Sequence, residues 1–451
     1  MGMACLLHAQ EQGEAKQPDA VATVTITANQ TITDEEVFDE ATSVVITSNA
    51  RFIKGENGRL IFRRPFNAPR SQLFEGFAPG DVVFEGKGCD AGGNVFPEWW
   101  GATASDDPTS GGVNVSAINA ALASVANTPL AVSLSGVYYI NNKVRPLSSS
   151  RLTAAERGAI KAVPNLSLPP GDYMVEIKGQ SQVTIDGIEV DGNRANQTQS
   201  AAHAYGGIIA VNSNHCTIKN CKIHDCNGPP TGGAVGNGVR THRATEITIA
   251  DNEIYSNNGC GINLYNTSSK IRVVHNTIHN NCEIGIESEG RGENYKDYRN
   301  TAITIADNDI VGSAEKGRLD DHSVLVDWND DVTITGNRCR NSTHNGIEVL
   351  GSSKVAISNN DCENNGDVGP PYTWAGIRIT AEGFLEDGRS SDVAIRNNKV
   401  TGSQYGIYLD TVDRAVIHAN TITDTVHGPL MIGPRASDVD ISGNRIEQTR
   451  R

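Results

Sequence analysis

The segment TIADNEI at residues 248–254 returns almost unchanged as TIADNDI at residues 304–310, and looser copies lie before, between and after these two. The looser copies are TIKNCKI (217–223), RVVHNTI (272–278), TITGNRC (333–339), AISNNDC (356–362), AIRNNKV (394–400), VIHANTI (416–422) and DISGNRI (440–446). Equivalent positions in consecutive copies lie 22 to 38 residues apart. Self-similarity at such a period is typical of a chain that winds into stacked turns.

Each copy alternates apolar and polar residues, as a β-strand with one buried face does. A second strand signal follows most copies after a polar stretch, and it usually opens with glycine. Examples are GINLYN (261–266), GIESEG (285–290), GIEVLG (346–351), GIRIT (376–380) and GIYLD (406–410). Short strands, glycine corners and no helical period between them predict an all-β parallel β-helix. A leucine-rich repeat would need more leucine and a helical or 3₁₀ arm in each repeat.

One position of the repeat holds asparagine in every copy except the first, where Cys221 replaces it. The asparagines are Asn252, Asn276, Asn308, Asn337, Asn360, Asn398, Asn420 and Asn444. Asparagine tolerates the left-handed conformation of a tight corner, and its amide can bond to equivalent amides in adjacent turns. We therefore expect these asparagines to be structural rather than catalytic.

The cysteines show no metal-finger spacing. Cys339 and Cys362 occupy the inward apolar slot of the repeat, which predicts small core side chains. Cys216, Cys221 and Cys226 are expected to be packed thiols rather than a disulfide framework.

Charge and hydropathy exclude several classes of function. The chain has 451 residues, 38% of them hydrophobic, and a formal net charge of −15. That charge argues against nucleic acid and anionic membranes as partners, and it means that a polyanionic substrate would need local cations. No apolar stretch is long enough to span a membrane. Residues 1–20 are predicted to be a flexible lead or the remnant of a secretory signal, so the expected location is secreted or periplasmic.

The N-terminal third has a different organisation. Residues 21–92 carry short β signals that predict a small β region, and residues 93–451 are assigned to the β-helix domain. Helical spacing predicts a helix over 113–126, with Ser116 or Asn114 as its N-cap. LAVSLSGVYYI at 130–140 predicts a strand after it.

The order of FPEWWGATASDD (96–107), an alanine-rich helix and a G-x-Y-x-I strand resembles the start of the pectate-lyase-like superfamily. That superfamily of right-handed parallel β-helix proteins includes polysaccharide lyases, polygalacturonase-type hydrolases and phage tail-spike depolymerases. The resemblance implies that the helix caps the first coil and that the β-helix is right-handed. It implies no single reaction. Trp99 and Trp100 are expected to pack the cap rather than to bind sugar.

In a strand opened by glycine, the second and fourth residues after the glycine should point outward. Reading these positions turn by turn predicts one column on the outer surface. It runs Arg240 with His242, Asn263 with Tyr265, Glu287 with Glu289, Leu325 with Asp327, Glu348, Arg378 with Thr380, and Tyr408 with Asp410. Adjacent turns lie about 4.8 Å apart, so the acids of this column should crowd together.

Crowded carboxylates are costly unless a cation lies among them or some stay protonated. Calcium binds through carboxylate and amide oxygens, so a calcium site is one interpretation. A glycosidase pair drawn from Glu287, Glu289, Asp327 and Glu348 is a second. A merely acidic surface is the third.

The calcium hypothesis has a family parallel. In the lyase family of chondroitinase B and many alginate lyases, an Asn on one coil and a Glu-x-Glu on the next hold calcium. Asn263 and Glu287-Ser-Glu289 look like that arrangement. The resemblance implies a lysine base shortly afterwards, where this chain offers Arg291 or Lys296 at changed spacing. It also implies an arginine on the following coil, where this chain has Asp327.

A lyase needs a base and cationic groups for sugar carboxylates. Candidates for the base are Lys296, Tyr265 and His242, and candidates for substrate binding are Arg240, Arg291, Arg378, Tyr372, Trp374 and Tyr408. The leading hypothesis is a calcium-assisted lyase acting on an acidic glycan. The alternatives are a glycoside hydrolase or transferase on the same carboxylates, and a non-catalytic spike or adhesin. A homotrimer is compatible with all three.

Overall fold

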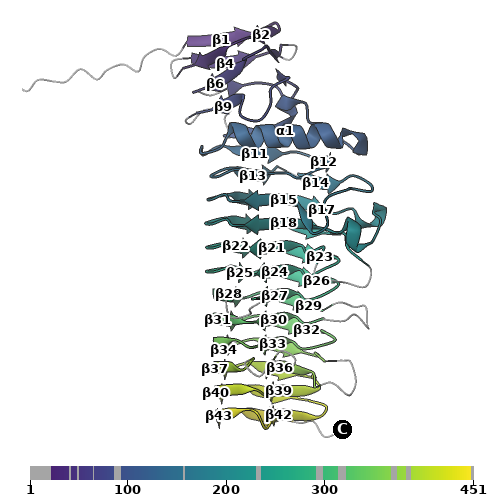
Figure 1. The fold of residues 1–451 in the computed structure, drawn as a ribbon, viewed down its shortest axis with the longest axis vertical. Helices are drawn as coiled ribbons and strands as arrows, with labels where there is room; N and C mark the ends of the chain where they lie inside the picture. The colour runs from purple at the N-terminus through teal and green to yellow at the C-terminus, as the bar shows by residue number, and fades with distance from the viewer. Residues whose placement is uncertain are drawn as a thin grey trace, which may run out of the picture.

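The computed structural model describes residues 22–39, 42–47, 50–63, 66–85, 93–155, 158–229, 235–290, 298–312, 321–366, 373–381 and 388–447. Their backbone winds into a right-handed parallel β-helix whose strands stack along one axis (Figure 1). The predicted fold class is therefore confirmed. Three long parallel sheets form its sides, and every paired strand in them lies one turn from its neighbour.

The thirteen-stranded sheet carries the first strand of each repeat. Its strands are β10 (Asn94–Val95), β11 (Ala131–Leu134), β13 (Arg151–Ala154), β16 (Thr184–Asp186), β19 (Thr217–Lys219), β22 (Thr248–Ala250), β25 (Arg272–Val274), β28 (Asn300–Ala306), β31 (Asn329–Thr335), β34 (Ser353–Ser358), β37 (Ser390–Arg396), β40 (Val412–His418) and β43 (Ser437–Ser442).

Most strands of the twelve-stranded sheet begin directly after the asparagine position of the repeat. Its strands are β12 (Val137–Ile140), β14 (Ala159–Ala162), β17 (Glu189–Asp191), β20 (Lys222–His224), β23 (Glu253–Tyr255), β26 (Thr277–His279), β29 (Asp309–Val311), β32 (Arg338–Arg340), β35 (Asp361–Glu363), β38 (Lys399–Thr401), β41 (Thr421–Thr423) and β44 (Arg445–Glu447).

The ten-stranded sheet carries most of the glycine-opened strands. Its strands are β15 (Asp172–Lys178), β18 (Tyr205–Val211), β21 (Val239–His242), β24 (Ile262–Tyr265), β27 (Ile286–Glu289), β30 (Val324–Asp327), β33 (Ile347–Leu350), β36 (Ala375–Thr380), β39 (Tyr405–Leu409) and β42 (Gly428–Ile432). The opening glycines let adjacent turns approach closely. A Cβ placed on Gly285 would lie 2.7 Å from the carbonyl oxygen of Ser323 and 2.5 Å from Cγ2 of Ile310.

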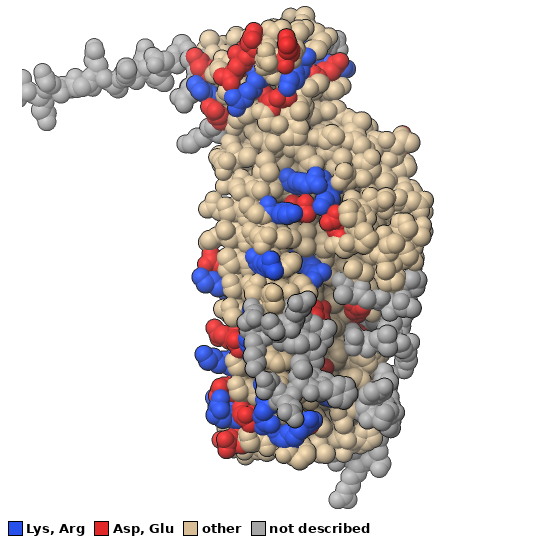
Figure 2. Space-filling view, in the orientation of Figure 1, with Lys and Arg blue, Asp and Glu red and all other residues tan. Residues whose placement is uncertain are grey.

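The N-terminal region is a short stack of coils with three sheets of its own. The sheets are β1 (Ala22–Ile26), β4 (Thr42–Ile46) and β7 (Phe66–Asn67); β2 (Gln30–Ile32), β5 (Phe52–Lys54) and β8 (Phe74–Glu75); and β3 (Glu35–Phe38), β6 (Arg59–Phe62) and β9 (Val82–Phe84). Phenylalanine rings fill its interior, for example Phe62 stacked on Phe84 at 5.3 Å. Figure 2 shows acidic and basic side chains interleaved over these coils, where Arg59 pairs with Glu35 at 2.6 Å.

The helix α1 (Gly111–Ser124) crosses the chain where the two stacks meet (Figure 1). The N-cap prediction is wrong, because a 3₁₀ turn, η2 (Pro108–Ser110), leads into the helix and places its N-cap at Ser110. Asn114 lies inside the helix, where its Oδ1 accepts a hydrogen bond from the Thr103 amide at 2.8 Å. The single strand expected at 130–140 is two, β11 and β12, because Ser135 and Gly136 turn the chain between two sheets.

Trp99 and Trp100 lie on a second 3₁₀ turn, η1 (Pro97–Trp100), and both are buried. Trp99 packs edge-on against Phe66 and Phe96. These contacts confirm packing as their role. Two further 3₁₀ turns, η3 (Arg194–Asn196) and η4 (Ala201–His203), lie in the insertion at 192–206.

The repeated asparagines form a continuous buried ladder, as predicted. Each side-chain amide donates to Oδ1 of the asparagine one turn on, at 2.9–3.0 Å from Asn252 to Asn444. The conformational reason given for them is wrong, because the left-handed residue is the one before each asparagine. Those residues, with φ between 54° and 68°, are Asp251, His275, Asp307, Gly336, Asn359, Asn397, Ala419 and Gly443. The ladder asparagine is selected by its hydrogen bonds.

The seven cysteines in the described ranges are buried free thiols, which agrees with the sequence interpretation. Cys339 and Cys362 are register partners on β32 and β35 and are fully buried in the core. Among the described residues, no helix is long and apolar enough to cross a membrane.

Candidate functional site

The outward side of the ten-stranded sheet carries the predicted column as two rows. The first row pairs, turn by turn, Arg240, Asn263, Glu287, Leu325, Glu348, Arg378 and Tyr408. The second pairs His242, Tyr265, Glu289, Asp327, Leu350 and Thr380. The inward residues between them, such as Ile286 and Val326, are fully buried. We call the surface formed by these two rows the acidic face.

Asn263 and Glu287 are bonded directly. The amide nitrogen of Asn263 donates to Oε2 of Glu287 at 2.5 Å, and the thiol of Cys260 donates to the same oxygen at 3.3 Å. Burial and then the neighbouring Glu289 raise the pKa of Glu287 to about 7. Ionising Glu287 beside Glu289 is thus costly, as expected for carboxylates crowded on adjacent positions.

The ligand set for a cation fits these residues. Oδ1 of Asn263 is buried and accepts no hydrogen bond from the residues that the structure describes, and Asn263 as a whole is 4% exposed. Glu287 and Glu289 stand on the next coil with their carboxylates on the same side of the strand. An amide oxygen and two carboxylates are oxygen donors of the kind that calcium takes.

Tyr265 lies between the candidate calcium ligands and two basic side chains, Arg240 and His242. The guanidinium of Arg240 lies 4.1 Å from the Tyr265 ring centroid, and the His242 ring meets the same tyrosine edge-on at 5.3 Å. Burial, and then Arg240 and Arg243, lower the pKa of His242. The His242 imidazole is therefore neutral at pH 7 and able to accept a proton.

Glu348 lies at the centre of a second cluster. Its Oε1 accepts a hydrogen bond from Arg378 at 2.7 Å, and its Oε2 accepts one from the Asn345 amide at 3.0 Å. The Arg378 guanidinium lies 5.6 Å from the Trp374 ring and 5.8 Å from the Tyr408 ring. Burial raises the pKa of Glu348 although Arg378 opposes the shift.

Sequence reasoning missed two histidines in this cluster. Nδ1 of His322 lies 3.2 Å from Oε2 of Glu348, and the His344 ring stacks on Trp374 at 4.1 Å. Burial lowers the pKa of His322 to about 3 and that of His344 to about 4, so both rings are neutral near pH 7. Both precede an outward strand, in HSV (322–324) and HNG (344–346). A histidine shortly before the strand on two consecutive turns was the sequence signal that could have identified them.

The structure thus brings most of the predicted residues onto one face. Glu289, Asp327 and Glu348 are buried there, at 8%, 2% and 4% exposure, while Glu287, Arg240 and Arg378 are half-buried. Arg291, Lys296 and Tyr372 lie outside the described residues.

A third group lies on the twelve-stranded sheet. Glu189, Asp191 and His224 bring one possible ligand atom each within 4.8 Å of one another. Protein cations already neutralise these acids, because Lys161 binds Asp191 at 2.7 Å and hydrogen bonds to Asp225 and Glu189 help to raise the pKa of His224 to about 9. We interpret this group as a structural ion network.

Comparison with known proteins agrees with the fold. The family model described as "Right handed beta helix region" matches residues 127–302 and 298–446. The uncharacterized protein YclG of Bacillus subtilis (strain 168) is 25% identical over 316 residues, which cover 65% of this chain and 50% of YclG. The chain therefore spans about half the length of that curated relative.

Two solved structures are similar in fold. The A-module of the mannuronan C-5 epimerase AlgE6 from Azotobacter vinelandii superposes with a TM-score of 0.60 and 18% identity, covering 79% of this chain and all of the module. A hyperthermoactive exopolygalacturonase from Thermotoga maritima gives a TM-score of 0.60 at 12% identity, covering 78% of this chain and 91% of the enzyme. At these identities the likeness concerns the fold alone.

Proposed function

The chain belongs to the right-handed β-helix family, and on that premise we propose that it cleaves an acidic polysaccharide by β-elimination on the acidic face. The observation that carries the proposal is the bonded pair Asn263 and Glu287 beside Glu289. It combines an amide oxygen that has no hydrogen-bond partner in the described part of the chain and a carboxyl whose pKa is raised to about 7. Both features are expected of a cation site.

Asn263, Glu287 and Glu289 would hold calcium. When bound, calcium would withdraw charge from the carboxylate of a uronate sugar and make the neighbouring C5 proton more acidic. The names of the two fold neighbours, a mannuronan epimerase and an exopolygalacturonase, refer to polymers of sugar acids. They support the choice of substrate class.

The remaining steps fall to side chains of the acidic face. His242, neutral at pH 7, accepts the C5 proton. The C4–C5 double bond then forms as the C4–O4 glycosidic bond breaks, and the leaving oxygen takes a proton from solvent. Tyr265 lies between His242 and the acids in the same row. Arg240 and Arg378 bind substrate carboxylates near the two ends of the first row. They are five steps apart, or about 24 Å at about 4.8 Å per step, which spans several sugar units. Trp374 and Tyr408 flank Arg378 and offer ring faces to sugars.

The test uses the full chain with polygalacturonate, alginate and chondroitin sulfate. We expect one of them to yield the ultraviolet band of unsaturated uronate products, and we expect chelation to abolish it and added calcium to restore it. Glu287→Gln should lose at least 100-fold in rate. Glu363→Gln, on the twelve-stranded sheet, is the matched control and should be unaffected. Equal rates for Glu287→Gln and the unchanged protein would exclude the proposal.

Hydrolysis is the second candidate, and one observation favours it. A carboxyl with a pKa of about 7 is protonated in about half of the molecules at pH 7 and can act as the general acid that a glycosidase needs. In that case Glu287 donates the proton and Glu289 or Asp327 acts as the second carboxylate. The products would then be reducing ends without the ultraviolet band, and chelation would have no effect.

A further inference from the structure

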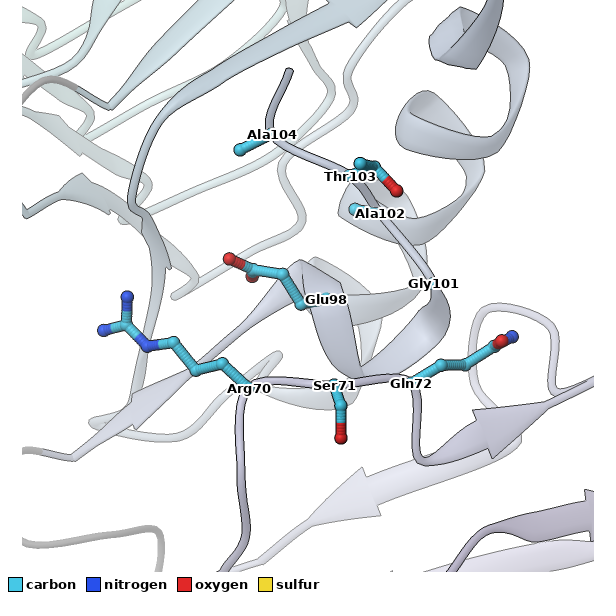
Figure 3. Close-up of a pocket in the computed structure, with 8 residues that line it drawn as sticks. All are labelled: Arg70, Ser71, Gln72, Glu98, Gly101, Ala102, Thr103 and Ala104. Carbon is cyan, nitrogen blue, oxygen red and sulfur yellow. The ribbon is translucent and has the colours of Figure 1, made fainter. Parts of the chain in front are cut away.

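A pocket of about 430 Å³ lies where the N-terminal coils meet the main stack. Arg70, Ser71 and Gln72 line one side, and Glu98 and residues 101–104 line the other (Figure 3). These segments belong to the loop before β8 and to the turn η1 with the residues after it. The pocket shares no residue with the acidic face.

The cation at this pocket has no polar partner within the described ranges. Arg70 makes no hydrogen bond or ion pair in the described structure, and its guanidinium rests 3.8 Å from the centroid of the Phe96 ring. Oγ of Ser71 and Oε2 of Glu98 also have no hydrogen-bond partner among the described residues, but both atoms are closed off from solvent and lie behind the pocket wall. Arg70 is therefore the charged group that the pocket offers to a ligand.

The other oxygen of Glu98 is fixed from within the fold. Oε1 accepts hydrogen bonds from the hydroxyls of Tyr138 at 2.8 Å and Ser135 at 2.9 Å. In Figure 3 the Glu98 carboxylate and the Arg70 guanidinium extend to the same side. The ring beneath Arg70 and the two hydroxyls on Glu98 hold both charges in place before any ligand binds, which lowers the entropy lost on binding.

Small residues keep the pocket open. Gly101 has a φ of 90°, and a Cβ there would lie 3.0 Å from Nε2 of Gln72. Ala102 and Ala104 follow it in the same wall. A volume of about 430 Å³ is within the range of small-ligand sites, and one or two sugar rings would fill it.

We infer that this pocket binds a sugar-acid unit of a saccharide, separately from the acidic face. Arg70 pairs with the sugar carboxylate through its planar fork, and Gln72 and Thr103 meet sugar hydroxyls, which both donate and accept. A solvated arginine beside a crevice between two coil stacks is the simpler alternative. It does not explain why the Arg70 guanidinium is held against the Phe96 ring at the edge of a pocket of this size. The ligand class rests on the proposed function, but the site does not.

The test is hydrogen exchange measured by mass spectrometry on the full chain, with trigalacturonate and with neutral maltotriose as probes. We expect trigalacturonate to protect peptides covering residues 66–75 and 96–105, and maltotriose to protect them at least tenfold more weakly. Arg70→Gln should weaken that protection at least tenfold. Thr103→Tyr, an exposed position whose larger side chain fills the pocket, should do the same. Arg396→Gln, an exposed arginine on β37, is the control.

Each outcome separates the two sites. Glu287→Gln should lose activity and keep protection at the pocket, whereas Arg70→Gln should keep activity on short substrates. The inference is overturned if trigalacturonate leaves both peptides unprotected, if maltotriose protects them equally, or if Arg70→Gln changes nothing. If Glu287→Gln still lost activity in that case, the proposed function would be supported and only the inference about the pocket would fail.

Discussion

Arg378 donates a hydrogen bond to Glu348 at 2.7 Å across one step of the coil, and the carboxylate it binds is almost closed off from solvent. Burying such a pair costs desolvation energy that the contact only partly returns. The ring centroids of Trp374 and Tyr408 lie 5.6 Å and 5.8 Å from the guanidinium. This arrangement presents a fixed cation to whatever binds the acidic face.

We expect Arg378→Lys to raise KM about tenfold with little change in kcat. A lysine ammonium keeps the charge but loses the planar fork and the stacking between two rings. Steady-state kinetics on the polymer identified by the activity screen provides the measurement. Arg338→Lys, on the twelve-stranded sheet, is the control. An unchanged KM in Arg378→Lys would remove Arg378 from the substrate-binding residues.

Calcium should stabilise the protein more at pH 8 than at pH 5. Burial raises the folded pKa of Glu287 to about 7, above the ordinary value of 4.5. The unfolded chain therefore loses this proton first, and stability falls as pH rises from about 4.5 to about 7. A bound cation offsets that loss. At a calcium concentration of 100 Kd the gain is about 2.7 kcal/mol.

Thermal unfolding with and without calcium at the two pH values measures this effect. Glu287→Gln should remove this pH dependence and weaken the response to calcium, because the carboxyl with the raised pKa is gone and the site loses one of its charged ligands. Asp361→Asn, which changes a half-buried, outward-facing acid of β35, is the control and should keep both the pH dependence and the response to calcium. A calcium response of equal size in Glu287→Gln would place the ion elsewhere.

The ion network around His224 should make stability depend on pH in the alkaline range. Hydrogen bonds to Asp225 and Glu189 and the charge of Asp191 overcome the effect of burial and raise the pKa of His224 to about 9. Because the folded pKa exceeds the unfolded value of about 6.5, the contribution is complete below pH 6.5 and is lost as pH passes 9. At about 1.4 kcal/mol per pKa unit it amounts to at most about 3.5 kcal/mol. Denaturant unfolding of His224→Gln from pH 6 to pH 10 should show a flatter profile than the unchanged protein.

Removing one amide of the asparagine ladder should be costly. In Asn337→Ala, the backbone and side-chain amides of Asn308 lose their acceptor, and the bonds from Asn337 to Ile305, Thr335 and Asn360 disappear. We expect a loss of about 5 kcal/mol, at about 1 kcal/mol for each of these bonds. Asn142→Ala, an exposed asparagine outside the ladder, should cost less than 1 kcal/mol. Equal stability of the two variants would show that packing alone fixes the coil.

The sequence repeat alone predicts most of the fold. Period-two alternation predicts which residues point inward, and a register of one turn per repeat then aligns Glu287, Leu325 and Glu348. Corner geometry was harder to predict. Residues as different as Asp251, His275 and Ala419 all take the left-handed conformation before a ladder asparagine, so residue type alone does not predict the corner.

The site was predictable only along the strands. His322 and His344 stand before strands β30 and β33, where the chain bends and strand alternation no longer gives a side chain's direction. Their contacts with Glu348 and Trp374 depend on the course of each corner. The pocket beside Arg70 arises from two segments about thirty residues apart that no repeat relates, so no periodic pattern announces it.

The ladder also makes a whole coil removable as a unit. Asn308 and Asn337 are 29 residues apart and occupy equivalent positions. A deletion of residues 309–337 would join Asn308 directly to Arg338. Asn308 would then take the place of Asn337 in the ladder, so the two coils that meet would still pair at equivalent positions. Leu325 would go with it, so Glu287 and Glu348 would become immediate neighbours. Shortening the rod by one layer is thus a way to bring two carboxyl groups together without changing either of them.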